Sequence, residues 1–253
     1  MKFPALFLLL ALLVTSRPAA AAGDWPAQFD VANKSYAEGK FADAAGVYEK
    51  MIRQARAEHA VSPALYFNDG NAEFKLGHLG RAIAAYRHAA LLAPRDGETL
   101  GNLEFVRNQV PGASVRPGRW QGFIGSLTLN EGACVTAVLF WLTFALLTMR
   151  QLRPALALRL HGVTLAVVGL TVLSLGVLAV QATEHFHAQT AVVIQANAIA
   201  RSGPFDDAQN VFPVHDGTEL SILDWHDDWL QVTDGSGRIG WLPRHDLELL
   251  PGA

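Results

Sequence analysis

Two uncharged apolar runs divide the chain. They cover residues 132–149 and 162–180, and neither contains a charged side chain. Because a helix needs roughly 20 apolar residues to cross the hydrocarbon core of a bilayer, this pattern predicts transmembrane helices over 131–149 and 161–182. The alternative is a pair of buried core helices, for which the rest of the chain supplies too small a soluble shell.

A third apolar run, residues 3–14, opens the chain. Lys2 precedes it and four alanines, 19–22, follow it. A short apolar run between a basic residue and small residues is the layout of a secretory signal peptide. The pattern therefore predicts a signal peptide over 1–22, with an uncleaved membrane anchor as the alternative.

Residues 23–110 show helical periodicity that repeats at a spacing of 38 residues. The matched positions are Phe29/Phe67, Asn33/Asn71, Tyr36/Phe74, Gly39/Gly77, Ala44/Ala82 and Tyr48/Tyr86. They predict a helix, a glycine turn and a second helix, twice over, with a closing helix over 96–110. The run NAEFKLGHLGRAIAAYRHAALLAP resembles the tetratricopeptide repeat. That repeat has a period of about 34 residues, so we expect a longer loop near 57–62.

The resemblance to tetratricopeptide repeats implies a groove lined by the first helix of each pair. We expect Asn68, Asn71 and Lys75 to bind a partner rather than to hold the fold. The alternative is that the aromatic residues are core and the asparagines only satisfy helix ends. The complete predicted set of groove residues is Asn33, Tyr36, Asn68, Asn71, Phe74, Lys75 and Asn102, together with the aromatics Phe29, Phe67 and Phe105.

A Pro- and Gly-rich stretch, 111–130, is predicted to be a linker, and the pattern changes to short alternating segments over 188–250. Turn residues separate these segments, as is typical of β-strands. This region contains the runs RSGPFDDAQNVFPVHDGTELSIL and DDWLQVTDGSGRIGWLP. Through these runs it resembles bacterial SH3 domains, which implies a small barrel. The predicted strands cover 191–194, 198–201, 219–223, 229–233 and 238–242.

Two tryptophans flank the DGSG turn of this SH3-like domain. We expect Trp241 to pack inside the barrel, because Gly240 and Pro243 constrain its strand. We expect Trp229 to line an exposed aromatic groove. Both are predicted residues of a binding surface.

Composition narrows the functional classes. The chain is 51% apolar, 17% charged and has a net charge of −3, so it has no basic excess for binding nucleic acid. Cys134 is the single cysteine, which excludes a disulfide framework or a CxxC site. The sequence contains no HExxH, P-loop or GxSxG motif, and we predict no catalytic residues, no metal and no cofactor. A metal or redox sensor using His185 and His187 is a minor alternative.

Arg150, Arg153 and Arg159 are the charged residues between the two apolar runs, in a predicted loop over 150–160. Positive loops stay in the cytoplasm. With an exported N-terminal module, this predicts a multi-pass inner-membrane protein of a bacterium, with both soluble modules in the periplasm.

The whole arrangement is a multidomain membrane protein: an all-α repeat module, two transmembrane helices and a small all-β SH3-like barrel. It resembles the BatE-type proteins of bacterial aerotolerance operons. The resemblance implies a non-enzymatic scaffold that binds other membrane proteins of the same operon, among them Bat proteins with von Willebrand A domains. The alternative is a membrane-anchored sensor that binds peptidoglycan.

Overall fold

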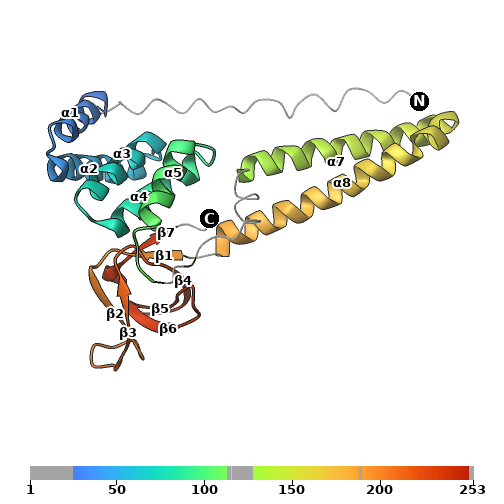
Figure 1. The fold of residues 1–253 in the computed structure, drawn as a ribbon. Coiled ribbons are helices and arrows are strands. Elements are labelled where there is room, and N and C mark those ends of the chain that lie inside the picture. The colour runs from blue at the N-terminus through green and yellow to red at the C-terminus, as the bar shows by residue number, and fades with distance from the viewer. Residues whose placement is uncertain (1–24, 113–114, 116–127, 188–189, 251–253) are drawn as a thin grey trace.

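The chain folds into a helical module, a long helical hairpin and a β-module (Figure 1). The predicted signal peptide and most of the predicted linker lie outside the residues that the structure describes. The computed structural model describes residues 25–112, 115, 128–187 and 190–250.

The helical module has two helix pairs and a fifth helix, as the repeated pattern predicts. Each pair turns at a glycine in the left-handed region, Gly39 at φ +76° and Gly77 at φ +81°. Side chains with a Cβ rarely adopt this conformation. The helices are α1 (Trp25–Ala37), α2 (Phe41–Glu58), α3 (Pro63–Lys75), α4 (Leu79–Leu92) and α5 (Gly97–Arg107).

The longer first repeat does not produce a longer loop, and that prediction is wrong. Helix α2 has 18 residues whereas α4 has 14, so the additional residues extend the helix. The run ARAE consists of helix-favouring residues, and α2 ends only where His59 adopts a left-handed conformation.

Small and aromatic residues alternate in the core of the helical module. Ala44 and Ala82 are fully buried, which lets neighbouring helices approach closely. Tyr48 and Tyr86 are 1% exposed and fill the space beside them. The two repeats therefore pack by the same arrangement of residues.

The hairpin consists of α7 (Leu129–Leu152) and α8 (Pro154–His187), which project away from the two modules (Figure 1). Both helices are long and apolar enough to cross a membrane. Most of their large apolar side chains are exposed, which contradicts the alternative of core helices. Hydroxyl pairs join the two helices, Thr136 to Ser174 at 2.6 Å and Thr143 to Thr171 at 2.9 Å.

The predicted loop 150–160 is almost entirely helical, contrary to expectation. Only Arg153 separates the two helices, and α8 starts directly at Pro154. Proline is favoured in the first turn of a helix because its missing N–H would have no helical partner there. The hairpin therefore has a tight turn.

The β-module is a seven-stranded antiparallel sheet with the order β3-β2-β6-β5-β4-β1-β7. Every second residue along the strands points inward, and these residues form the core. Leu220, Leu230 and Leu242 are among them and are fully buried. The strands are β1 (Thr190–Val193), β2 (Asn197–Arg201), β3 (Asn210–His215), β4 (Glu219–His226), β5 (Trp229–Thr233), β6 (Ile239–Pro243) and β7 (Leu247–Leu250), with a short 3-10 turn, η1 (Arg244–Asp246), before β7.

The structure corrects the expectation of five strands, because β3 and β7 are two further ones. β3 contains Pro213, which counts against a strand in the sequence, since proline has no N–H for the ladder. The proline is tolerated because β3 lies at one edge of the sheet and pairs with β2 alone. β7 occupies the other end of that order, beside β1.

The helical module and the β-module share a hydrophobic core, although the hairpin separates them in sequence. Ile83 and Tyr86 of α4 and Val106 of α5 belong to one buried cluster with Val192 and Leu250 of the β-module. At this contact the backbones are so close that a Cβ on Gly80 would overlap the carbonyl oxygen of Val193. The two modules therefore form one body, which we call the head.

A buried charge triad lies in the same contact. Glu219 of β4 accepts hydrogen bonds from Arg87 of α4 at 2.6 Å and from Arg107 of α5 at 2.7 Å. The side chains of Glu219 and Arg87 are 2% and 8% exposed. Burial lowers the pKa of Arg87, and the charge of Glu219 opposes this effect. One acidic residue of the β-module is thus paired with two basic residues of the helical module.

We predict that Glu219→Gln destabilises the head by about 3–5 kcal/mol, because removing one partner of a buried ion pair leaves an uncompensated charge. Thermal unfolding of the purified full-length protein, followed by circular dichroism, measures this change. Glu248→Gln is the control. Its carboxylate lies 3.9 Å from Arg56 in an exposed pair, so we expect a loss below about 1 kcal/mol. Equal effects of the two variants would contradict a dominant role of the triad.

Candidate interaction surfaces

Four asparagines connect α1, α3 and α5, and we call this surface the ladder face: Asn33, Asn68, Asn71 and Asn102. Asn68 donates to the side-chain oxygen of Asn33 at 2.9 Å, and Asn102 donates to that of Asn71 at 3.2 Å. The same pattern recurs from one repeat to the next. The asparagines predicted as groove residues thus lie together as two hydrogen-bonded pairs, Asn33 with Asn68 and Asn71 with Asn102.

Buried tyrosines hold the same amides from inside. The hydroxyl of Tyr48 donates to Asn33 and that of Tyr86 to Asn71, both at 2.7 Å. Burial raises the pKa of Tyr48 to about 12, so this hydroxyl remains a donor at neutral pH. Asn33 and Asn71 therefore have a role in the fold, and their binding to a partner stays a prediction.

The other predicted groove residues flank the ladder. Tyr36 is half-buried and packs edge-on against Phe41, with ring centroids 5.2 Å apart. Phe74 packs in the same way against Phe105 at 5.7 Å, and Phe105 is 59% exposed. Lys75 is exposed one residue further along α3. This region offers an apolar ring and a cation to solvent. Phe29 and Phe67 instead pack against the core.

The β-module presents both tryptophans on its outer side. Strand alternation puts Leu230 and Leu242 inside, so their neighbours Trp229 and Trp241 lie outside, and both are half-buried. The expectation that Trp241 packs in the core is wrong. That expectation assumed that Gly240 and Pro243 hold the strand so that Trp241 faces the core. Successive side chains of a strand instead point to opposite faces, and Leu242 occupies the inward position.

A cation and a second ring cover part of this aromatic surface. The guanidinium of Arg201 lies 5.3 Å from the ring centroid of Trp229, within the range of a cation–π contact. His226 packs edge-on against Trp241 at 6.4 Å. Asp206 and Asp227, almost fully exposed, lie 3.5 Å from Arg201 and 3.8 Å from His226. The surface is therefore aromatic with an acidic border.

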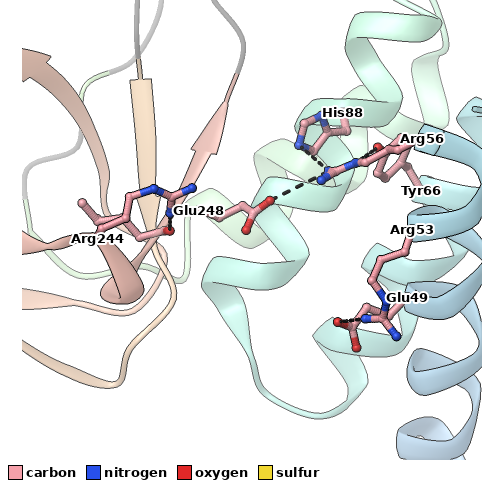
Figure 2. Close-up of polar contacts among 8 residues, drawn as sticks. Glu49, Arg53, Arg56, Tyr66, His88, Arg244 and Glu248 are labelled. Atoms are coloured by element: carbon pink, nitrogen blue, oxygen red, sulfur yellow. Dashed lines mark hydrogen bonds and ion pairs between the residues drawn. The ribbon is translucent and has the colours of Figure 1, made fainter. Parts of the chain in front are cut away.

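A polar cluster links three helices to the β-module at the edge of the head (Figure 2). Arg56 of α2 donates to the hydroxyl of Tyr66 at 2.8 Å, contacts His88 at 3.3 Å and faces Glu248 of β7 at 3.9 Å. The rings of Tyr66 and His88 stack with centroids 4.9 Å apart. Burial, helped by the charge of Arg56, lowers the pKa of His88 to about 4. His88 is therefore neutral at physiological pH.

Asp69 of α3 is half-buried, and one oxygen of its carboxylate is unsatisfied. Its Oδ1 atom is buried and has no hydrogen-bond partner among the described residues. Burial, together with the negative charges of Glu73 and Glu49, raises its pKa to about 7, although Arg81 and Arg56 oppose the shift. Asp69 is therefore partly protonated near neutral pH.

The described residues contain no group of three or more His, Cys, Asp or Glu side chains that could hold a metal ion. The side chains of His185 and His187, the minor metal hypothesis, lie outside the described part of the chain. The triad of Arg87, Arg107 and Glu219 was not predicted from the sequence. An arginine in the alanine-rich run AIAAYRHAALL was the available signal, since it follows directly on a core tyrosine.

Comparison with known proteins places part of the chain beside proteins without a described function. No family model matches the chain. It is 36% identical over 89 residues to the uncharacterized protein YgiM of Escherichia coli K12, which covers 34% of this chain and 42% of that protein. The YgiM proteins of Escherichia coli O157:H7 and Shigella flexneri match equally. The match thus spans less than half the length of these relatives.

We predict that Asn71→Ala destabilises the head by about 1–3 kcal/mol, because the buried hydroxyl of Tyr86 loses its acceptor. Lys75→Ala, one helical turn away and exposed, should change the stability by less than about 0.5 kcal/mol. Chemical denaturation of the two full-length variants makes the comparison. A wild-type stability for Asn71→Ala would show that the ladder does not support the fold.

The stability of the head is expected to depend on pH through Asp69. The pKa of Asp69 is higher in the folded state than its ordinary value of 3.8, so the folded state binds a proton that the unfolded state has released. Its contribution to stability is complete below about pH 4 and is lost as the pH rises towards about 7. Asp69→Asn should therefore raise the melting temperature at pH 8 and have less effect at pH 5.

Melting temperatures measured from pH 5 to pH 8 test this expectation. Asp30→Asn, an exposed aspartate on α1, is the matched control and should leave the pH profile unchanged. His88 acts in the opposite direction, since a base with a lowered pKa costs stability as the pH falls from 6.5 towards 4. A profile that Asp69→Asn does not alter would contradict the assignment.

Proposed function

We propose that this chain is a non-enzymatic, membrane-anchored scaffold whose head binds protein partners. The observation that carries the proposal is the contact between the two modules. Arg87 and Arg107 before the hairpin meet Glu219 after it, so the segments on either side of the two long helices form one head. Because the two modules are packed together, the ladder face and the aromatic surface keep a fixed distance and orientation relative to each other.

The contact also constrains membrane topology. Two modules that share a core must lie on the same side of a bilayer, which requires an even number of crossings between them. The helices α7 and α8 supply two. Arg95 of the helical module forms two hydrogen bonds, at 3.0 and 2.9 Å, with Glu131 at the start of α7. This exposed contact supports a head that lies close to the membrane surface.

The sequence supports the direction of insertion. A signal peptide over 1–22 would export the helical module, and the three arginines at the hairpin turn would remain in the cytoplasm. The head then lies in the periplasm of a bacterium, anchored in the inner membrane.

The identity of the modules remains part of the proposal. The two helix pairs with glycine turns support tetratricopeptide-like repeats, and the small antiparallel sheet supports an SH3-like domain. Together with the resemblance to BatE-type proteins, they favour membrane proteins of the same operon as partners, including Bat proteins with von Willebrand A domains. The role would then be in an aerotolerance or envelope-stress complex.

A second candidate function is a sensor that binds peptidoglycan through the β-module. The half-buried rings of Trp229 and Trp241 favour it, because aromatic rings on a sheet surface can stack on a ligand. The acidic border, with Asp206 and Asp227, disfavours an anionic polymer. Protein partners therefore remain the first proposal.

Reporter fusions test the topology. Alkaline phosphatase fused after Val110 and after Ala253 should be active, because each fusion point follows a segment of the proposed periplasmic head. A fusion after Arg153 should be inactive with this reporter and active with a cytoplasmic one. An inactive phosphatase after Ala253 would overturn the model of two crossings.

Co-purification from solubilised membranes tests the function. The double variant Lys75→Ala/Phe105→Ala removes exposed groups beside the ladder, so we expect it to lose protein partners at an unchanged melting temperature. Lys50→Ala/Val211→Ala, two exposed residues elsewhere, should retain them. If only Trp229→Ala/Trp241→Ala reduces binding, and the ligand lost is purified peptidoglycan, the sensor is the correct function.

A further inference from the structure

A groove opens at the turn of the hairpin, far from both modules. Its volume is about 600 Å³, and it is lined by Phe144, Ala145, Thr148, Met149 and Leu152 of α7, with Arg153 and Leu156 at the turn. All of these lining groups except Thr148 and Arg153 are apolar. The groove thus leads from an apolar wall to a guanidinium.

The length of α7 gives the depth of the groove in a bilayer. Its 24 residues extend about 36 Å at 1.5 Å per residue, slightly more than the roughly 30 Å of hydrocarbon. Arg153, directly after the helix, therefore lies at the level of the lipid headgroups. The lining from Phe144 to Leu152 reaches about 12 Å back into the acyl-chain region.

The charges at the turn favour one kind of occupant. Residues 132–183 contain three arginines and no acidic residue. Arg150 contacts His161 at 3.3 Å, whereas Arg153 forms no ion pair within the described residues. A guanidinium at headgroup depth can form two parallel hydrogen bonds to a phosphate, and basic pockets on the cytoplasmic side of helix pairs bind anionic lipids.

We propose that this groove is a binding site for one anionic phospholipid. The phosphate binds Arg153, and the upper part of one acyl chain lies along Phe144, Thr148 and Leu152. The inference rests on the proposal that α7 and α8 cross a bilayer. It goes beyond that proposal because it names the class of lipid that binds and the residue that binds it, Arg153 rather than Arg150 or Arg159.

Native mass spectrometry of the full-length protein, released from nanodiscs of mixed phosphatidylcholine and phosphatidylglycerol, tests the site. We expect the wild type to retain one phosphatidylglycerol in preference to phosphatidylcholine. Arg153→Gln should reduce this preference about tenfold, the size of one lost charged hydrogen bond. Arg159→Gln removes the same charge six residues further along, in α8 and outside the groove lining, and it should retain the wild-type preference.

A second variant tests the apolar wall without changing any charge. Ala145→Phe fills the groove, so we expect it to lower the retention of phosphatidylglycerol. Equal losses in Arg153→Gln and Arg159→Gln would overturn the site, because they indicate attraction by the net charge of the turn. An absent preference in the wild type would overturn it too.

Carbonate extraction of membranes separates this outcome from a failure of the proposed anchoring. A protein that remains in the carbonate-washed membrane but shows no lipid preference refutes the lipid site alone. A protein that carbonate releases refutes the membrane-spanning hairpin, and with it the site.

Discussion

The head of this protein depends on one buried carboxylate. Glu219 lies between Arg87 and Arg107, and the hairpin separates it in sequence from both arginines, by 132 and 112 positions. A buried ion pair contributes little net stability compared with apolar residues of the same shape, but it is costly to break. The triad therefore selects a single docking arrangement, and the shared core around Ile83 and Val192 supplies the hydrophobic stabilisation.

This arrangement solves a problem of the short helical array. Stacked repeats bury their apolar faces against neighbours, and about three repeats are usually needed. Here two pairs and one further helix end at α4 and α5, and Val192 and Leu250 of the β-module contribute to the core at that end. Gly80 and Gly217 permit the close approach, since a Cβ on either would overlap atoms of the other module. The β-module thus takes the place of a terminal repeat.

The sequence predicted the local features well and the long-range ones poorly. Helical periodicity located both helix pairs, the two uncharged apolar runs located the hairpin, and Gly39 and Gly77 correctly marked the turns of the helix pairs. The repeat grouped the asparagines, but neither their pairing with one another nor the tyrosine hydroxyls that bind Asn33 and Asn71 followed from it, because a spacing does not specify hydrogen-bond partners. β3 was missed because Pro213 argues against a strand unless that strand is known to lie at an edge. The contact of Arg87 with Glu219 joins residues 132 positions apart, which no local pattern reports.

The shared core makes binding at one surface a property of the whole head. Any ligand that binds only the folded state stabilises that state by mass action. If the two modules unfold together, a partner bound at the ladder face also stabilises the β-module, which it does not touch. The coupling runs through the groups that join α4 and α5 to the sheet, with the buried Arg87 and Glu219 among them. Arg95 of the helical module also binds Glu131 at the start of α7, so a partner that holds the head acts on the body to which this end of the hairpin is bonded.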